Sequence, residues 1–296
     1  MFNWNDLESF LILSRNKKLK NASQKLNIEP TTISRRILRL EQKLGTKLFF
    51  RSNNNYVLTD DGNKLLPFSE KMESEAINIS EVFLNKNINL TGKVRISVPE
   101  GLGIEIFTKY LKDFFKVHKE LEIELIADSK SRSLINKEVD ISIGLSKPKS
   151  SKLKSWKLSN YNIQLYGSKN YLKENNIINN INELSKHKFV SYIDDLIDFP
   201  ELKYLQETLN DVKIVFRSNN LQAQLNAVKQ GVGIAFLHNF IAKKETNLNV
   251  ILKNQINITR EYWIIIHENL INLKRIKVAI DFVLNVFNRE KINISS

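Results

Sequence analysis

The sequence predicts an α/β protein with a small helical N-terminal domain, a long helix after it, and a larger body. Three observations support this prediction. Short helical patterns flank a three-residue turn within the first 45 residues. One amphipathic pattern then runs from about residue 60 to residue 87. Beyond residue 92, strand-like and helix-like segments alternate, which is typical of parallel sheets with crossover helices.

Positive charge is concentrated near the N-terminus. Of the 45 Lys and Arg residues, 11 lie in residues 1–58, beside only 4 Asp and Glu residues. The net charge of +13 is therefore weighted towards this part of the chain, as expected of a nucleic-acid-binding domain on a less charged body. A general bias towards Lys, Asn and Ile is the alternative explanation, and composition alone does not separate the two.

Several classes of protein are excluded by what the chain lacks. It contains no cysteine, so disulfides and thiolate metal sites are excluded. Its start, MFNWNDLESF, lacks the basic and apolar regions of a signal peptide. The longest apolar patches, such as WIII at residues 263–266, are of strand length and too short to cross a bilayer. We therefore expect a cytoplasmic protein with no membrane partner.

Residues 6–45 carry three short helical patterns, in the segments DLESFLILS, LKNASQKL and EPTTISRRILRLEQKLG. Pro30 suits the first turn of the third helix, and Gly45 suits its end. The apolar face that should pack on the first two helices is Ile33, Ile37, Leu40 and Leu44. Two helices joined by a tight turn, the second polar at its leading end, are typical of a helix-turn-helix.

The opposite side of the third helix carries hydroxyl and guanidinium groups. Hydroxyls bond phosphates or base edges, and arginine binds guanine through two hydrogen bonds or pairs with phosphate. The candidate DNA-binding residues on this helix are Thr31, Thr32, Ser34, Arg35, Arg36 and Arg39. A solvated helix face is the alternative interpretation. The tight turn and the local charge favour DNA binding.

A predicted β-hairpin follows, because LFF and YVL are strand-like and the turn-forming residues 53–55 join them. A hairpin in this position is a wing, and Arg51 is placed to contact phosphate. Thr59 then suits the N-cap of the long helix, with Asp60 and Asp61 at its positive end.

The long helix has an apolar stripe that nothing local covers. The stripe consists of Leu65, Phe68, Met72, Ile79 and Phe83. Pairing with a second copy is the predicted use of this stripe, and packing against its own wing is the alternative. Pro67 lies within the pattern and should kink the helix or shift its start.

The ordered motifs of the first 66 residues resemble the winged helix-turn-helix of LysR-type transcriptional regulators. DLESFLIL, ASQKLNIEPTTISRRILRLEQKLGTKLF, Arg51 and LTDDG carry the resemblance. Three features depart from the family pattern. KKLKNAS replaces a small-residue stretch, Glu29 stands where a Ser N-cap is common, and the proline falls one position early. These departures affect capping and sequence preference rather than the fold.

The resemblance continues through EVDISI, SNN at residues 218–220, AVKQGVGIAFL and HENL. It implies an effector domain of the periplasmic-binding-protein type, with two Rossmann-like lobes and a small molecule bound between them. The implied domains are a winged helix-turn-helix at 1–59, a linker and dimerisation helix with hinge at 60–91, and the effector domain at 92–296. Lobe I would cover about 92–160 and 266–296, and lobe II about 161–265. Residues 133–139 are predicted to form a short helix.

Effector contacts are expected where strands of both lobes end beside helix starts, because ligands of open α/β sheets bind in such a crevice. The candidates are Glu100, Gly101, Leu102, Ser129, Ser218 and Asn219. Free amide donors there would suit a small organic anion, and an amino acid is the other candidate. Glu100 opposes an anion unless it points away, or else favours an amine-bearing ligand. Ordinary helix capping is the alternative role of these polar residues.

No constellation for catalysis is found. GLG at 101–103 and GVG at 231–233 lack the third glycine of a dinucleotide fingerprint. The four histidines have no metal-ligand spacing. We therefore expect a regulator that is not an enzyme and that has no cofactor or metal. Its expected partners are double-stranded promoter or operator DNA, a small-molecule effector and further copies of itself in a homodimer or homotetramer, with RNA polymerase as a further candidate. The alternatives are a solute-binding receptor and a nucleoid protein that binds any DNA sequence.

Overall fold

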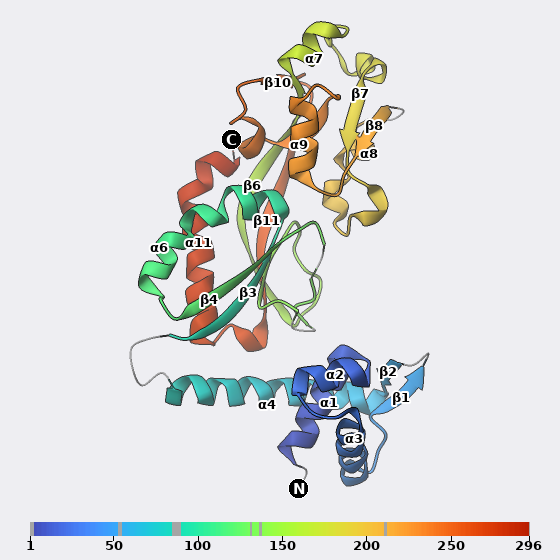
Figure 1. Ribbon diagram of the computed structural model, residues 1–296, viewed down its shortest axis with the longest axis vertical. Helices are drawn as coiled ribbons and strands as arrows, with labels where there is room; N and C mark the ends of the chain where they lie inside the picture. Colours follow the sequence, from blue (N-terminus) through green and yellow to red (C-terminus); the bar gives the residue numbers. More distant parts are fainter. Residues whose placement is uncertain are drawn as a thin grey trace. The chain divides into compact units, whose positions relative to one another are not determined.

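The computed structural model describes residues 3–52, 55–84, 90–130, 132–135, 138–209 and 212–295. The chain divides into two compact units, Met1–Ile88 and Asn89–Ser296, which run from blue to cyan and from teal to red in Figure 1. In the part of the chain just listed, no helix is long and apolar enough to span a membrane.

The first unit is a winged helix-turn-helix. Its elements are α1 (Trp4–Asn16), α2 (Leu19–Leu26), α3 (Pro30–Leu44), β1 (Phe49–Ser52), β2 (Asn55–Leu58) and α4 (Asp60–Leu84). The three short helices enclose a core of Leu7, Phe10, Leu13, Ala22, Ile33, Ile37 and Leu40. Pro30 opens α3, and Gly45 follows it in the left-handed conformation with φ 71°. The predicted helix-turn-helix is therefore confirmed.

Helix α4 begins where the sequence predicts. The hydroxyl of Thr59 accepts a hydrogen bond from the Gly62 amide at 3.0 Å, as an N-cap does. The helix then continues through Pro67 without interruption. An ion pair between Arg15 and Glu73, at 2.9 Å, joins α4 to α1.

The residues of the apolar stripe of α4 differ in how far they are buried. Leu65 packs against the core of its own unit. Phe68 is 68% exposed, Met72 42% and Ile79 59%. The side chain of Phe83 lies outside the described part of the structure. Three of the five predicted dimerisation residues are thus large apolar side chains that their own unit leaves uncovered.

The second unit is built on a curled seven-stranded sheet of order β10-β6-β11-β5-β3-β4, in which β9 also pairs with β6. The strands are β3 (Gly92–Val98), β4 (Leu121–Ala127), β5 (Ile141–Gly144), β6 (Leu153–Ser168), β9 (Ala235–His238), β10 (Leu248–Ile251) and β11 (Ile258–His267). A separate parallel pair joins β7 (Lys188–Ser191) to β8 (Lys213–Arg217). These strands form the two-lobed α/β architecture that the sequence predicts.

The main sheet is mixed rather than wholly parallel. Strand β3 pairs parallel to β4 and to β5, as the alternation of elements predicts. The long strands β6 and β11 run antiparallel to each other along ten residues, with one irregularity in register between Tyr262 and Trp263. These are the two longest strands of the sheet, and they lie at its centre. The predicted parallel pairing therefore holds in the first part of the sheet and is wrong at its centre.

Helices cover the sheet and line its edges. They are α5 (Glu100–Glu105), η1 (Phe107–Tyr110), α6 (Leu111–Val117), α7 (Lys169–Glu174), η2 (Ile181–Lys186), η3 (Asp194–Leu196), η4 (Pro200–Leu202), α8 (Tyr204–Thr208), α9 (Leu221–Lys229), α10 (Asn239–Ala242), η5 (Glu268–Leu270) and α11 (Lys274–Ser295). Helices α6 and α11 lie on one side of the sheet (Figure 1), where Phe107 and Phe114 meet Phe282 edge to face or tilted. The helix predicted at 133–139 is wrong: its described residues form turns and loop.

The second glycine of GVG has a packing role. A Cβ atom at Gly233 would lie 2.4 Å from the backbone oxygen of Lys188. That oxygen accepts a hydrogen bond from Ile234, and Ile234 bridges to Phe189 of β7. Gly233 therefore allows the chain before β9 to join β7, which explains this glycine without a bound nucleotide.

Candidate nucleic-acid interface and effector cleft

The exposed face of α3 lies opposite its buried residues Ile33, Ile37 and Leu40. Thr31 and Arg35 are exposed there, and Thr32 and Ser34 are partly exposed. The side chain of Arg35 has no hydrogen bond or ion pair with any described residue. Its guanidinium group is therefore available to a partner, and its five donors match base edges and phosphates.

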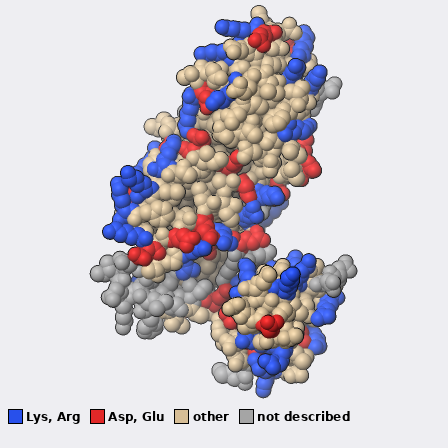
Figure 2. Space-filling view, viewed as in Figure 1, with Lys and Arg blue, Asp and Glu red and all other residues tan. Residues whose placement is uncertain are grey.

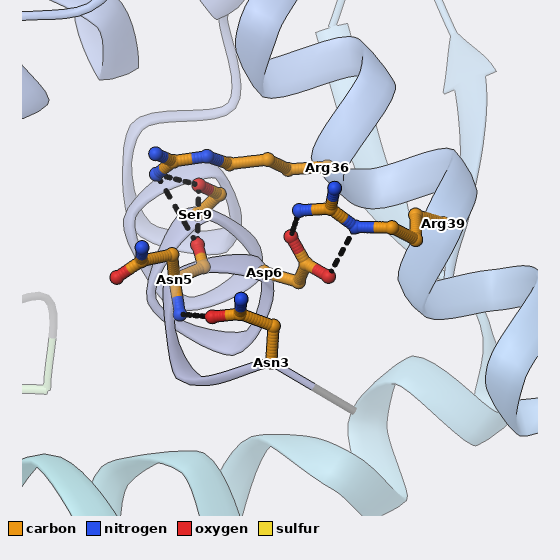
Figure 3. A network of polar contacts seen from close by, with 6 residues as sticks. All are labelled: Asn3, Asn5, Asp6, Ser9, Arg36 and Arg39. Carbon is orange, nitrogen blue, oxygen red and sulfur yellow. Dashed lines mark hydrogen bonds and ion pairs between the residues drawn. The ribbon is translucent and has the colours of Figure 1, made fainter. Parts of the chain in front are cut away.

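Two further arginines of α3 are held by α1 (Figure 3). Arg39 Nε donates to Asp6 Oδ2 at 2.7 Å, and a second guanidinium nitrogen donates to Asp6 Oδ1. Asp6 is only 1% exposed. The hydrogen bond to Asp6 raises the pKa of Arg39 above its ordinary value. Arg36 Nη1 donates to Ser9 Oγ at 3.3 Å and to the Asn5 carbonyl at 3.4 Å.

The start of α1 is itself ordered by short-range hydrogen bonds. Asn3 Oδ1 accepts from the Asn5 amide at 2.9 Å, and Ser9 Oγ donates to the Asn5 carbonyl at 2.8 Å. The same carbonyl receives Arg36, so the N-cap of α1 and the arginines of α3 form one network (Figure 3). Sequence reasoning missed these partners. A signal was present, because Asp6 falls in helical register with the buried residues Phe10 and Leu13.

The wing positions Arg51 beside Tyr56. The two residues face each other across the hairpin, and the guanidinium carbon lies 5.1 Å from the centre of the tyrosine ring. Arg51 Nη2 also donates to the Tyr56 hydroxyl at 2.6 Å. Arg51 is exposed, so this stacking holds a cation on the surface of the wing.

An apolar residue on the exposed face of α3 was also missed. Leu38 is 49% exposed and lies one turn beyond Arg35. It falls outside the spacing of the buried residues Ile33, Ile37 and Leu40, which is the signal that could have identified it. On a DNA-binding helix, an exposed leucine would suit the methyl group of thymine. Lys and Arg side chains are spread over the N-terminal unit in Figure 2, with Asp and Glu side chains between them.

The predicted effector residues come together where the two lobes of the second unit meet. Glu100 Oε2, at the start of α5, accepts from the Leu221 amide at 2.9 Å. Glu100 Oε1 accepts from the side-chain amide of Asn220. Ser129 Oγ, just after β4, donates to the Asn219 carbonyl at 3.3 Å. The strand ends of both lobes therefore converge as predicted.

The amides at the start of α9 are not free, which corrects one expectation. The Leu221 amide donates to Glu100, and the Ala223 amide donates to Asn220 Oδ1 at 2.7 Å. Ser218 Oγ accepts from the Asn220 amide at 3.1 Å and so acts within its own turn. The carboxylate of Glu100 thus occupies the position that an anion would take at this helix N-terminus.

A small cavity of about 20 Å³ lies beside these contacts. Its lining includes Glu100, Gly101, Ser129 and, from the other lobe, Leu221 and His238. Leu102 is fully buried and absent from this lining, so its contact with an effector stays a prediction. A volume of this size holds about one water molecule, so the cleft is closed.

His238 lies beneath the cleft in an aromatic cluster. Its Nε2 is 3.2 Å from the Tyr204 hydroxyl, and its Nδ1 has no hydrogen-bond partner in the described part of the chain. Burial lowers the pKa of His238 to about 4, so the ring is neutral at physiological pH. Tyr161 lies next to it and stacks on Tyr262 with 4.1 Å between ring centres. No described group of His, Asp or Glu side chains could hold a metal ion.

Comparison with known proteins defines the family. Residues 88–288 match the LysR substrate binding domain, and residues 4–63 match the bacterial regulatory helix-turn-helix protein of the lysR family. The chain belongs to the LysR family. Proteins of this family are transcriptional regulators with a DNA-binding helix-turn-helix and an effector-binding domain. The domain matches confirm the fold class that the sequence predicts.

Individual relatives of this LysR-family protein are distant. The glycine cleavage system transcriptional activator homolog of Haemophilus influenzae is 24% identical over 97% of this chain and 95% of its own length. The iron-regulated virulence regulatory protein IrgB of Vibrio cholerae is 24% identical over 80% of each chain. Among solved structures, a full-length OxyR variant from Pseudomonas aeruginosa covers 96% of this chain and 95% of its own, with a TM-score of 0.71 and 15% identity. Full-length LysG from Corynebacterium glutamicum with bound effector Arg covers 97% and 99%, with a TM-score of 0.68 and 13% identity.

Proposed function

We propose that this LysR-family regulator recognises operator DNA through the exposed face of α3 and the wing. The observation that carries the proposal is the free guanidinium group of Arg35, which follows the exposed Thr31 and the partly exposed Thr32 and Ser34 on the same helix. In this proposal Arg35 reads a base edge, with Thr31, Thr32 and Ser34 at bases or phosphates. Arg36, Arg39 and Arg51, which are held by α1 and by Tyr56, lie nearer phosphates.

The same proposal includes assembly and location. The exposed residues Phe68, Met72 and Ile79 of α4 support pairing with a second copy, which would present two recognition helices to a two-fold symmetric site. We infer a homodimer or homotetramer in the cytoplasm, without catalytic activity of its own. RNA polymerase is a further proposed partner, as expected of a protein that regulates transcription.

The cleft beside Glu100 is the proposed effector site, because residues predicted from both lobes converge there. Glu100, Gly101 and Ser129 line its cavity, while Asn219 contributes its carbonyl and Ser218 orders the turn. A small organic anion loses the donors expected at the start of α9, since Glu100 occupies the Leu221 amide. The carboxylate of Glu100 still favours an amino acid or another amine-bearing ligand.

A filter-binding titration tests the regulator. It compares DNA from upstream of the protein's own gene with random DNA at the same salt concentration. Tighter binding to the upstream DNA is expected, because base contacts add to the salt-dependent phosphate contacts that any sequence supplies. Equal affinity for both would contradict sequence-specific regulation and favour a nucleoid protein that binds any sequence.

A further inference from the structure

The buried carboxylate of Glu100 has no positively charged partner in the described part of the chain. Glu100 is only 8% exposed. Both oxygens accept hydrogen bonds, from the Asn220 side chain and the Leu221 amide, and both donors are neutral. A buried carboxylate without a counter-ion carries a desolvation cost that neutral donors only partly offset.

A second carboxylate lines the same cavity. Asp128 follows β4 and is paired with Arg132, and the Lys130 amide donates to Asp128 Oδ1 at 3.2 Å. Burial raises the pKa of Glu100, and the charge of Asp128 raises it further. Among the described residues, Arg132 pairs with Asp128 and no cation pairs with Glu100, so the charge of the Glu100 carboxylate is not compensated.

A third acceptor comes from His238, which is 2% exposed and lines the cavity. His238 Nδ1 lies close to Gly101 on the cavity wall, because a Cβ atom added at Gly101 would be 3.9 Å from it. In the tautomer with its proton on Nε2, His238 donates to Tyr204, and Nδ1 is a free acceptor. A neutral ring adds no positive charge to the site.

We propose that the effector is a small organic amine whose ammonium group binds between Glu100, Asp128 and Nδ1 of His238. An ammonium group has three N–H donors, and these three residues supply acceptors for them. The cavity of about 20 Å³ has room for a group of the size of one water molecule, which an ammonium group matches.

The remaining wall of the closed cavity is apolar. It consists of Leu145, Phe199, Leu202 and Leu221, with Pro99 at its edge. These side chains offer apolar contact and no charge, so they would suit an aliphatic or aromatic body once the cavity widens beyond the volume of one water molecule. The proposal rests on the proposed function of the cleft as the effector site and specifies the chemistry that it recognises.

Isothermal titration calorimetry of the full-length protein tests the ligand class with matched probes. 2-Phenylethylamine and 3-phenylpropionate share a body and differ in the charged group, and isoamylamine and 4-methylpentanoate form an aliphatic pair. We expect an amine to bind and its matched acid to bind more than about tenfold more weakly, because the acid adds repulsion to a buried carboxylate. Acids that bind as tightly as the amines, or an absence of amine binding at millimolar concentration, would overturn the proposal.

Variants locate the site. Glu100→Gln keeps the size and an acceptor for Leu221 but removes the charge, and it should weaken amine binding at least about tenfold. Glu105→Gln, which removes a carboxylate that pairs with Lys244 outside the cavity, should leave amine affinity unchanged. Amine binding that survives Glu100→Gln would place the ligand elsewhere. The comparison of amine with acid on the unaltered protein needs no variant, so a misfolded Glu100→Gln protein leaves the proposal testable.

Failure of the proposed function would look different. Equal affinity for upstream and random DNA would contradict sequence-specific regulation while amine binding, measured without DNA, stayed as expected. Acid binding with intact operator specificity would contradict the amine class alone. The two assays therefore separate the two proposals.

Discussion

Asp6 and Arg39 join the start of α1 to the third turn of α3, with Arg39 Nε 2.7 Å from Asp6 Oδ2. Asp6 is buried, whereas the side chain of Arg39 remains 49% exposed. One side of the guanidinium group is thus fixed by the protein, and the rest stays accessible to solvent. This geometry sets the orientation of α3 against α1 and presents a cation beside the face that we propose to contact DNA.

Asp6→Asn removes the charge that holds Arg39. We expect a lower thermal midpoint for the N-terminal unit and weaker binding to all DNA sequences alike, because the change affects helix placement rather than base contacts. Differential scanning fluorimetry and filter binding measure the two effects. Glu8→Gln, on the same helix but only partly buried, is the matched control. A variant with full stability and altered base preference would contradict this role.

Arg35→Ala tests base reading. The loss should be about 1–3 kcal/mol on the operator, with relaxed preference at one base pair. Arg51→Ala should instead weaken binding to all DNA sequences alike, and it should reduce the salt dependence of the binding constant by roughly the contribution of one phosphate contact. Competition binding with single-base-pair variants at several salt concentrations distinguishes the two. Equal losses on operator and random DNA for Arg35→Ala would show that this residue contacts only phosphate.

The exposed side chain of Leu38 leads to a prediction that depends on an apolar contact with DNA rather than on a hydrogen bond. If its exposed side chain contacts a thymine methyl group, uracil in place of that thymine should weaken binding by about 1 kcal/mol, near the value of one buried methylene. Leu38→Ala should bind both DNAs with equal affinity. A scan of the operator with single uracil substitutions measures this. An unaltered protein that tolerates every substitution would exclude the contact.

Met72→Asp tests assembly through α4. An aspartate placed in a buried apolar interface carries a desolvation cost of several kcal/mol, so the dimer should dissociate at micromolar concentration. Lys71→Asp introduces the same residue beside the stripe and should leave the dimer intact. Light scattering gives the mass of each variant. An unaltered protein that is monomeric yet binds its operator would remove the role proposed for the exposed residues of α4.

The N-terminal unit was largely predictable because its determinants are local. Pro30, Gly45 and Thr59 mark helix ends within a few residues of the groups that they cap. The convergence of strand ends in the effector unit was also predictable, since it follows from topology. Which donors remain free there was not predictable, because Glu100 reaches an amide 121 residues away. The first half of β6 was missed, since its polar residues give no continuous strand signal.

His238 predicts a pH dependence of stability in the effector unit. Burial lowers its pKa from 6.5 to about 4 in the folded protein. Between these two values the unfolded chain binds a proton that the folded chain does not, so stability rises with pH. The contribution is therefore complete above about pH 6.5 and is lost as the pH falls towards 4, about 3 kcal/mol in all.

Urea unfolding near pH 7.5 and near pH 5 measures this effect. The unaltered protein should lose about 2 kcal/mol more than His238→Gln between the two conditions, because glutamine does not titrate. Burial also lowers the pKa of His187, and that contribution is common to both proteins and cancels in the comparison. Equal slopes for His238→Gln and the unaltered protein would mean that folding does not shift the pKa of His238, which would contradict its burial as a neutral ring.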